Sequence, residues 1–489
     1  MTRRHSASFL AIAAVTAVAL SAGAAQRADA QARGISESDR RLGAQEHPKI
    51  LAEFGGAYNG PGVAMVNKVG KSIAVQSGIA ATGSECTVTL LNTTVVNAFA
   101  IPGCYTYVTR GLLSIMNDEA ELASVIGHEI GHVAARHSQK RQQRSTIAGL
   151  GSVLAGIFLG GQVAQLANIF AQANVLSYSR SQEFQSDDLG IRYMNAAGYD
   201  PYASADMLKS LGDQSALESR LRGQTEAAQV PTWQRSHPLT TDRVNRATQT
   251  AQKTGVRPGQ KARNADQYFA AVDGMLYGDD PSQGYAEDSV FSHPTLKIRF
   301  QAPQGFYLNN ATDSVTMEGP NNLRAQFSGG RLSGSLDNYV TGVAQALVGQ
   351  SQGVQAGSIQ RTNINGMPVS ILPLRARTQS GNVDVQIVGY QWDSGTAYHF
   401  VTIAPAGSSG NFESLIRSLR RLSDSEAAAL RPRVIDVVTV GAGDTIQSMA
   451  RRMAFSNYQQ ERFLVLNDRQ ANQPLRPGEK VKIIVYGRG

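Results

Sequence analysis

The feature that most constrains this chain is a pair of histidines four residues apart, with a glutamate directly after the first. Residues 127–132 read Gly-His-Glu-Ile-Gly-His, inside a stretch whose apolar positions recur at helical spacing. On a helix, His128 and His132 lie on one face, so both imidazoles can hold one ion. Two histidines and a glutamate among apolar residues would be costly to bury without a partner. Because neutral imidazole is a good zinc ligand, the motif predicts one zinc ion per chain.

Glu129 follows the first histidine by one residue, so we expect its carboxylate to reach a zinc-bound water rather than the ion. There it can take a proton from the water and later pass it to a leaving amine. A catalytic zinc usually has three protein ligands and one open position. Farther along the chain, Glu183 and Asp187 lie four residues apart, on one face of an expected helix. We expect Glu183 to be the third ligand and Asp187 to accept an N–H from a ligand histidine, with an ordinary solvated acidic face as the alternative.

The N-terminal segment has the pattern of a secretion signal. Arg3 and Arg4 precede an almost uninterrupted apolar run over residues 9–25, and a small-x-small cleavage pattern ends at Ala30. We therefore predict a signal peptide over residues 1–30 and a periplasmic protein, with a retained membrane anchor as the alternative. The net charge of +8 is spread along the chain. This pattern argues against nucleic-acid binding and leaves contact with an anionic membrane surface or peptidoglycan open.

The cysteines fall in a segment that reads as short strands. Residues 62–108 carry strand-like runs separated by Gly, Asn and Pro, after a polar, irregular stretch over residues 31–60. The run Asn97–Ala100 is one of these strands and ends at a Pro-Gly turn. Because an exported protein meets an oxidising compartment, we expect Cys86 and Cys104 to form a disulfide. Two buried free thiols are the alternative.

Helical patterns dominate residues 118–253. The motif helix is expected to run to His137, and Asp118 can cap its start, with Glu121 as the reciprocal partner. His137 lies five residues past the second motif histidine, on another helical face, so we expect it at the surface. Further helices are expected over residues 179–195 and, as a buried or membrane-grazing pair too short to span a bilayer, over residues 146–175.

The composition changes near residue 280, and this change indicates a boundary between two domains. Residues 286–423 alternate apolar and polar side chains in several runs and contain two helical stretches. This pattern predicts an antiparallel α+β domain, for which interaction or scaffold duty is our default expectation. A short polar, proline-bearing link over residues 423–432 leads to a last module over residues 433–487, with the order strand, helix, helix and strand.

Several strings in one order resemble a known peptidase family. They are similar to the zinc endopeptidases that include the CAAX prenyl endopeptidases, the membrane heat-shock protease HtpX and periplasmic BepA-like enzymes. The resemblance covers about residues 45–275 and implies an α+β protein, in which residues 31–280 form a mainly helical, gluzincin-type metallopeptidase domain with a small sheet. The chain departs mildly from the family at Ser186 and Cys104, where alanine and glycine are usual. The matching strings are NAFAIPG (97–103), TRGLL (109–113), ELASVIGHEIGHVAARH (121–137) and SRSQEFQSDDLG (179–190).

The resemblance also implies roles for individual residues. It gives Glu183 as a zinc ligand beside the two motif histidines, with Glu129 as catalytic base. It places the strand of Asn97, Ala98, Phe99 and Ala100 at the edge of the cleft, where an extended substrate can pair with it; a plain core strand is the alternative.

Two later elements resemble known features as well. The run Ser236-His237-Pro238, followed by Arg243, is similar to the family's His-Pro element. It implies that His237 lies near the zinc, either in its open position in a resting form or beside the oxyanion, with Arg243 close by; a capped helix start is the alternative. Residues 433–487 resemble a LysM module, a binder of N-acetylglucosamine-containing glycans, with a degenerate docking module as the alternative.

These observations predict a zinc-dependent endopeptidase of the bacterial envelope. By family analogy, its substrates are polypeptides, in particular unfolded or misassembled outer-membrane proteins. A chaperone-like or cell-wall-binding protein with a structural or plugged zinc site is one alternative. A cell-wall hydrolase, suggested by the last module, is the other.

Overall fold

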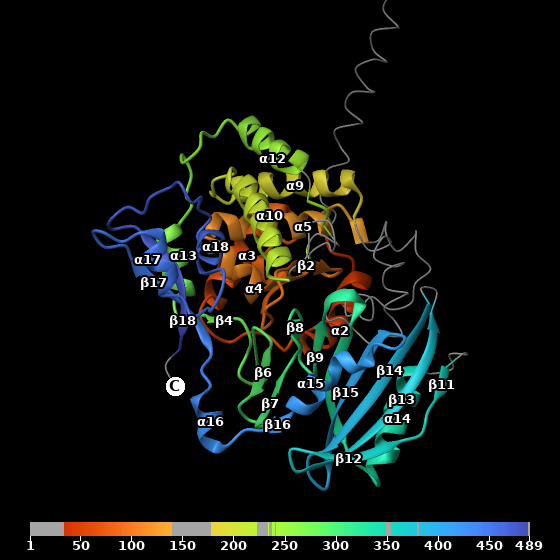
Figure 1. Cartoon of the computed structure of the whole chain (residues 1–489). Helices are drawn as coiled ribbons and strands as arrows, with labels where there is room; N and C mark the ends of the chain where they lie inside the picture. The colour runs from red at the N-terminus through yellow and green to blue at the C-terminus, as the bar shows by residue number, and fades with distance from the viewer. Residues whose placement is uncertain are drawn as a thin grey trace, which may run out of the picture.

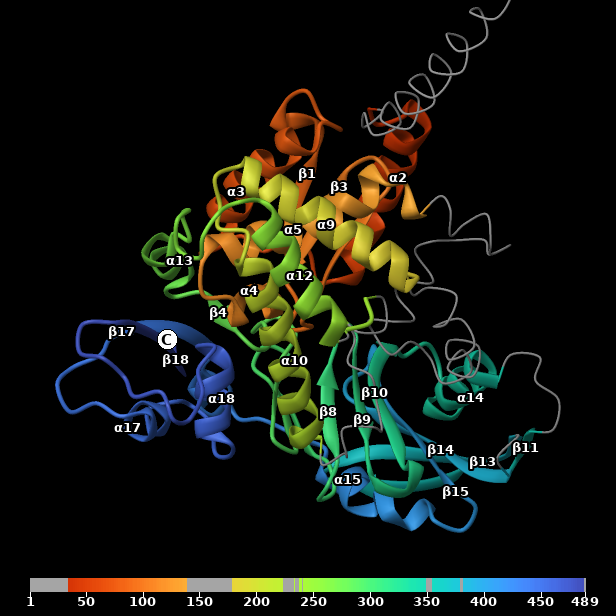
Figure 2. The same cartoon turned by 90° about the horizontal axis from the view of Figure 1, so that it is seen from above.

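The computed structural model describes residues 34–138, 178–222, 233, 237–239, 241–348, 354–378 and 381–487. The expected signal peptide, the apolar stretch over residues 146–175 and Ser236 lie outside these residues. A helical domain, a large sheet domain and a small C-terminal module make up the described protein (Figure 1). Figure 2 shows the sheet domain and the module on different sides of the helical domain. Within the described ranges, no helix is long and apolar enough to cross a bilayer.

Helix α5 (Glu119–Ala134) is the centre of the helical domain. It packs against α3 (Val63–Ser77), α9 (Arg180–Ala196) and α10 (Ala203–Leu221). Every residue of α5 from Glu119 to His132 is buried, so the motif helix runs through the core with neighbours on all sides. The other helices of the domain are α2 (Glu37–Glu53), α4 (Arg110–Ile115), α12 (Thr241–Lys253) and α13 (Ala265–Val272).

The start of α5 confirms the predicted cap, with a shift of one residue. Asp118 accepts a hydrogen bond from the backbone N–H of Glu121 at 2.8 Å. The reciprocal bond runs from the N–H of Asn117, rather than that of Asp118, to the Glu121 carboxylate at 2.7 Å. Both bonds satisfy N–H groups at the entry of the helix and therefore fix where its first turn begins.

A small sheet lies beside these helices. Its strand order is β1 (Thr87–Leu91), β3 (Tyr105–Thr109) and β2 (Ala98–Ile101). Strands β1 and β3 are parallel, whereas β2 is antiparallel to β3 and forms an edge of the sheet. A disulfide joins Cys86 and Cys104, with Cα atoms 4.8 Å apart. It ties the start of β1 to the turn between β2 and β3.

Two segments are helical where the sequence analysis predicted otherwise. The stretch over residues 31–60, expected to be irregular, contains α2, whose start is capped by the Ser36 hydroxyl. Helix α3 replaces the first two expected strands and lies between Gly62 (φ 93°) and Gly78 (φ 72°). The prediction failed because a short apolar run fits both a buried strand and a buried helix. Packing of α3 on α5 and β1 decides between them.

The domain after residue 280 is an antiparallel α+β domain, as expected. Its main sheet has the order β11-β13-β14-β15-β10-β9-β8, and β12 also pairs with β13. Helix α14 packs on one face through Val340 and Ala344, and a second small sheet and α15 pack on the other, where Phe300 meets Phe400. The elements of the main sheet are β8 (Tyr307–Asn310), β9 (Ser314–Glu318), β10 (Arg324–Arg331), β11 (Val354–Ala356), β12 (Gln360–Ile364), β13 (Met367–Thr378), β14 (Gly381–Gln391) and β15 (Thr396–Pro405). Those that cover it are α14 (Leu336–Val348), α15 (Glu413–Ser418), β5 (Tyr285–Glu287), β6 (Val290–His293), β7 (Ile298–Gln301) and β16 (Arg420–Arg421).

The C-terminal module has the expected strand–helix–helix–strand order, but it is joined to the helical domain. Its strands pair antiparallel, and β4 of the helical domain adds to β17. Apolar side chains of the module, among them Ile435 and Phe463, belong to the same core cluster as those of α5. The polar link before it contains the helix α16 (Asp424–Ala429). The remaining elements are β4 (Leu276–Tyr277), β17 (Arg433–Thr439), α17 (Ile446–Arg451), α18 (Gln459–Leu466) and β18 (Lys480–Tyr486).

A buried lysine marks this junction. Lys482 of β18 is fully buried, and its ammonium donates to the backbone carbonyl of Ser114 at 2.7 Å and to that of Met116. Both carbonyls lie just before the start of α5. The module therefore contacts the segment that leads into the motif helix.

Candidate metal centre

The site lies where α5 and α9 pack together, and glycines allow the two helices to approach closely. A Cβ atom on Gly190 would lie 2.8 Å from the backbone nitrogen of His128, and one on Gly127 would lie 3.0 Å from the carbonyl oxygen of Gly190. Gly131, one turn later, faces Ser186 in the same way. The Ser186 hydroxyl donates to the carbonyl of His128 at 2.8 Å. Because the backbones touch, side chains on both helices can meet at one point.

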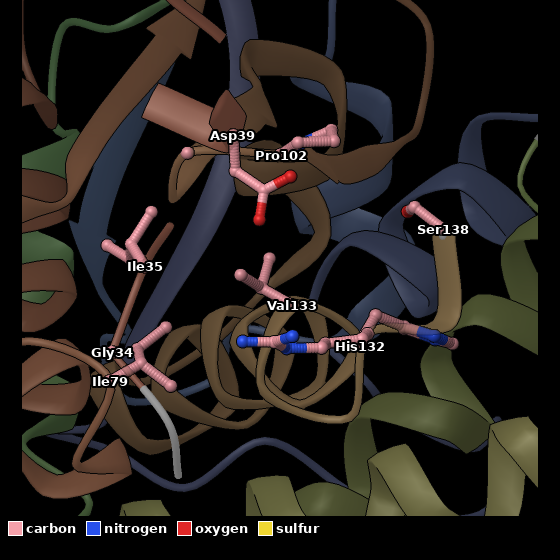
Figure 3. A pocket seen from close by; sticks show the side chains of 10 residues that line it. Gly34, Ile35, Asp39, Ile79, Pro102, His132, Val133 and Ser138 are labelled. Atoms are coloured by element: carbon pink, nitrogen blue, oxygen red, sulfur yellow. The ribbon is translucent and has the colours of Figure 1, made fainter. Parts of the chain in front are cut away.

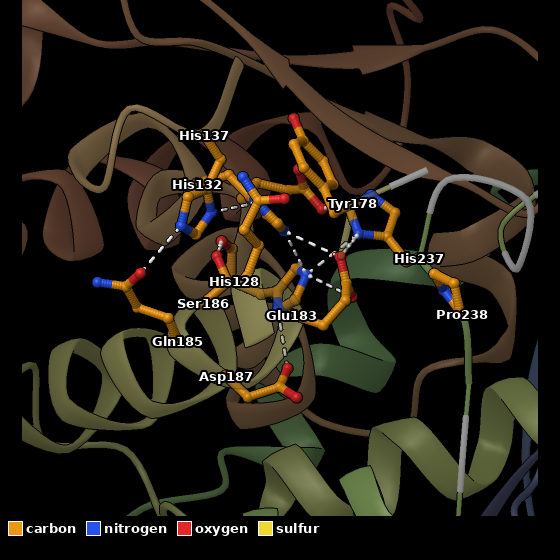
Figure 4. Close-up of polar contacts among 12 residues, drawn as sticks. His128, His132, His137, Tyr178, Glu183, Gln185, Ser186, Asp187, His237 and Pro238 are labelled. Atoms are coloured by element: carbon orange, nitrogen blue, oxygen red, sulfur yellow. Dashed lines mark hydrogen bonds and ion pairs between the residues drawn. The ribbon is translucent and has the colours of Figure 1, made fainter. Parts of the chain in front are cut away.

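Four buried side chains meet there: His128, His132, Glu183 and His237 (Figure 4). Their ligand atoms all lie within 4.8 Å of one another. The Nε2 atoms of His128 and His132 are 3.0 Å apart. The carboxylate of Glu183 lies 3.4 Å from the Nε2 of His132 and 3.6 Å from that of His128. The Nδ1 of His237 lies 3.2 Å from the same carboxylate.

The chemistry of this donor set fits zinc. The Nδ1 of His128 lies 2.8 Å from the Asp187 carboxylate, an acceptor, so its proton is on Nδ1 and its Nε2 presents a lone pair. That lone pair points towards the Nε2 of His132 and the carboxylate of Glu183. Such a cluster of electron-rich atoms is stable around a cation, and two imidazoles with one carboxylate are an established ligand set for zinc.

Arg243 of α12 holds the two carboxylates of α9 in place. Its guanidinium donates to both oxygens of Asp187, at 2.8 and 2.9 Å, and a third nitrogen lies 2.7 Å from Glu183. Arg243 is only 1% exposed, and its guanidinium also lies 5.4 Å from the ring of Trp233. The predicted neighbourhood of Asp187, Arg243 and His128 is thus brought together, and each charge in it has a partner of opposite sign or a hydrogen bond.

The surroundings of His132, Glu183 and Asp187 favour the protonation states that a metal needs. Burial lowers the pKa of His132 well below its usual range, so this imidazole is neutral at neutral pH. Burial alone would raise the pKa of Glu183, but His237, His132 and Arg243 hold it well below its usual range. For Asp187 too, Arg243 and the bond from His128 outweigh burial, and its pKa falls to about 2. Both carboxylates are therefore ionised.

Glu129 lies beside the cluster rather than in it, as its position in the motif predicted. It is 2% exposed, and one of its carboxylate oxygens accepts no hydrogen bond among the described residues. That oxygen lies 3.6 Å from the Nε2 of His237. The ring of His237 stacks on Trp233 at a centroid distance of 5.3 Å. The carboxylate of Glu129 and the Nε2 of His237 thus face each other beside the cluster of potential ligand atoms.

The prediction for His137 is wrong, and Tyr178 is an unpredicted member of the site. His137 is fully buried rather than at the surface, with its Nδ1 2.9 Å from the Nδ1 of His132. It reaches this place because α5 ends at Ala134 and Arg136 adopts a left-handed conformation (φ 55°), which turns the chain back. Tyr178 stacks on the His132 ring at 3.8 Å. Nothing in the sequence around Tyr178 indicates this contact. The spacing of the helix places His137 on another face, because it takes no account of the turn at Arg136.

The predicted edge strand lies beside α5. Asn97 precedes β2 and is fully buried, and both polar atoms of its side chain lack a hydrogen-bond partner among the described residues. Ala98 and Phe99 are buried as well, and Ala100 is half-buried. Next to the end of β2 is a small cavity of about 30 Å³, lined by the turn at Pro102, by the segment at the start of α2, and by His132 and its neighbours on α5 (Figure 3).

Comparison with known proteins agrees with this site. Residues 63–251 match the sequence profile described as "Peptidase family M48". The chain is 31% identical over 204 residues to the "Beta-barrel assembly-enhancing protease" of Yersinia pestis, an alignment that covers 39% of each protein. It is 34% identical to the "Mitochondrial metalloendopeptidase OMA1" of Arabidopsis thaliana, over 27% of this chain and 26% of that protein.

A third relative is shorter. The chain is 32% identical over 145 residues to the "Metalloprotease LoiP" of Escherichia coli, which covers 27% of this chain and 56% of that protein. The chain therefore spans between about a quarter and about half of the length of these relatives. The matched part includes the motif helix, Glu183 and Arg243. Residues 63–251 are accordingly similar to the peptidase domain of family M48.

Proposed function

We propose that this chain is an exported zinc endopeptidase that cleaves unfolded or misassembled envelope proteins. The observation that carries the proposal is the meeting of His128, His132 and Glu183 at one buried point, with the carboxylate of Glu129 beside it. Structural zinc sites are closed by four protein ligands, whereas catalytic sites keep one position open. Three ligands from two rigid helices and a nearby base are the parts of a hydrolytic site.

In this proposal, His128, His132 and Glu183 hold the metal, and Asp187 and Arg243 orient them. Bound zinc would supply a Lewis acid that polarises the scissile carbonyl and lowers the pKa of the attacking water. Glu129 accepts the proton of that water and then donates it to the leaving amine. The oxygen of Glu129 that accepts no hydrogen bond among the described residues is available for this transfer.

His237 has the position of a fourth ligand in a resting form. Its Nδ1 lies 3.2 Å from both the Nε2 of His128 and the carboxylate of Glu183. We propose that it occupies the open position until a substrate displaces it. Replacing His237 by alanine is expected to raise cleavage of an unfolded substrate. A fall would assign His237 to the oxyanion instead, and an unchanged rate would contradict both roles.

The substrate is proposed to bind as an extended chain along β2. Strand β2 is an edge, and the side chain of Asn97 has polar atoms without a partner among the described residues. An unfolded polypeptide suits this geometry because edge pairing requires a segment free of its own secondary structure. The names of relatives that enhance β-barrel assembly support outer-membrane proteins as the substrate class.

The test is cleavage of unfolded casein by the purified chain, with and without a zinc chelator. Replacing Glu129 by glutamine is expected to lower kcat by about 10²–10⁴-fold, the usual contribution of a general base, while zinc content stays at one per chain. Glu413→Gln, an exposed change of the same type in α15, is the control and should leave the rate unchanged. Cleavage of casein that survives both the Glu129→Gln substitution and the chelator would refute the zinc-dependent mechanism.

A second function is favoured by the place of His237. If His237 blocks the metal permanently, the chain is a chaperone-like or cell-wall-binding protein with a plugged site. Suppression of aggregation without cleavage in the wild type, with cleavage only in His237→Ala, would support that function. Glycan binding by residues 433–487 stays a prediction. If the chain is a cell-wall hydrolase instead, it should release fragments from purified peptidoglycan rather than cleave protein.

A further inference from the structure

The second motif histidine has an unusual partner. The Nδ1 of His128 faces the carboxylate of Asp187, but the Nδ1 of His132 faces another imidazole, that of His137, at 2.9 Å (Figure 4). The other nitrogen of His137, Nε2, lies 3.1 Å from the side-chain oxygen of Gln185 on α9. His132 and His137 are both buried, so solvent does not offer them alternative partners.

The direction of these hydrogen bonds follows from the chemistry of the groups. An amide oxygen only accepts, so the Nε2 of His137 carries the proton that it donates to Gln185. A neutral imidazole has one proton, and the Nδ1 of His137 is therefore an acceptor. It accepts a hydrogen bond from the Nδ1–H of His132. The Nε2 of His132, the atom that faces Glu183 at 3.4 Å, therefore has a free lone pair.

We infer that Gln185 and His137 form a relay that fixes the tautomer and the orientation of His132 for zinc. This inference rests on the proposed metal site. His137 and Gln185 touch no reacting atom and are positioning residues. They do for His132 what Asp187 and Arg243 do for His128, but with neutral groups, so the relay adds no charge to the site.

The backbone supports a specific role for His137. Arg136 adopts φ 55°, in the left-handed region. Glycine, asparagine and aspartate adopt this conformation far more readily than arginine does. Without this turn, His137 would continue the spacing of α5 and point away from His132. Residues held in such conformations cluster at functional sites, where the surrounding structure compensates their cost. Here the compensation includes the two hydrogen bonds of His137.

The test measures zinc affinity by competition with a chromogenic chelator, and the absorption spectrum of the cobalt-substituted protein. His137→Leu removes the acceptor and is expected to weaken zinc binding by about 10–100-fold, the usual effect of removing such a partner. His137→Asn keeps an acceptor oxygen and should bind more tightly than His137→Leu. Cobalt bands should shift in His137→Leu, because its ligand imidazole is no longer held in one orientation.

Variants of Gln185 provide a second test of the relay, because this side chain is exposed and its replacement leaves the core intact. Gln185→Leu is expected to weaken zinc binding at least threefold, and Gln185→Glu, which keeps an acceptor oxygen, should restore it. Gln182, one turn earlier on the same helix, accepts from the backbone N–H of Ser179 and bonds to no histidine among the described residues. Gln182→Leu is therefore the control for a general effect on α9 and should bind zinc as the wild type does.

The outcomes separate the relay from the function on which it rests. Zinc affinity within twofold of the wild type in both His137→Leu and Gln185→Leu would overturn the relay. An equal loss in Gln182→Leu and Gln185→Leu would overturn it too, because the effect would then be general to α9. In both cases a wild type that binds zinc and cleaves casein leaves the proposed peptidase standing, whereas a wild type that binds no zinc refutes both.

Discussion

Replacing Gly190 by alanine tests whether the close contact of α5 and α9 fixes the metal group. The new Cβ would lie 2.8 Å from the nitrogen of His128 and 2.9 Å from the carbonyl carbon of Gly127, whereas ordinary contacts begin at 3.4 Å. Both neighbours are backbone atoms that cannot turn aside, so α9 must move away from α5 by about 0.6 Å. Metal–ligand distances tolerate only about 0.2 Å. Because Glu183 belongs to α9, its carboxylate moves with the helix.

The expected result is a larger effect on zinc than on stability. Overpacking costs about 1–3 kcal/mol, and alanine in a helix regains about 1 kcal/mol relative to glycine. The free energy of unfolding of the zinc-free protein should therefore fall by about 0–2 kcal/mol. Zinc affinity should fall tenfold or more, because one of three ligands is displaced. Urea unfolding in the presence of a chelator measures the first quantity, and chelator competition measures the second.

The matched control is Gly342→Ala in α14. No atom lies within 4 Å of a Cβ built there, so the change should raise the free energy of unfolding by about 1 kcal/mol and leave zinc binding unchanged. Wild-type zinc affinity in Gly190→Ala would refute the argument, since it would mean that the helices can separate without moving the carboxylate from the histidines.

Three further predictions follow from buried contacts. Reduction of the Cys86–Cys104 disulfide, whose cysteines are 18 residues apart, should lower the free energy of unfolding in urea by about 3 kcal/mol; no change would mean that the unfolded chain gains no freedom. Arg243→Leu should cost about 3–5 kcal/mol in the zinc-free protein, because it leaves ionised carboxylates buried without their cation, and a loss below 1 kcal/mol in urea unfolding would contradict this. Burial lowers the pKa of Lys482 to about 7, so between pH 7 and 10 the unfolded chain binds a proton that the folded chain lacks. Stability should therefore rise with pH across this window, and Lys482→Met should abolish that rise in urea titrations at each pH.

The residues of the candidate metal centre were predictable because their signal is local. The spacing of His128 and His132, and that of Glu183 and Asp187, is read on a single helix and needs no knowledge of the tertiary structure. The cap at Asp118 is equally local. The meeting of the two helices was expected because a catalytic zinc needs a third ligand, and the family resemblance agreed with it. Its physical basis, contact through Gly127 and Gly190, cannot be read from either helix alone.

The errors arise where tertiary structure overrides local pattern. His137 was misplaced because a left-handed arginine ends the helical spacing, and no residue type signals that conformation. Helix α3 was read as strands because β-branched residues favour strands until packing against a helix decides. The contact between the C-terminal module and the helical domain was not predicted. A lysine in a strand usually faces solvent, whereas the side chain of Lys482 lies in the core.

The shared core of the module and the helical domain has a consequence for the order of folding. Strand β18 and helix α18 are synthesised after every residue of the candidate metal centre, yet their apolar side chains belong to the same core cluster as those of α5. A nascent chain that ends before the module still has that part of the core open to water. The helical domain therefore completes its interior only after the module has been made.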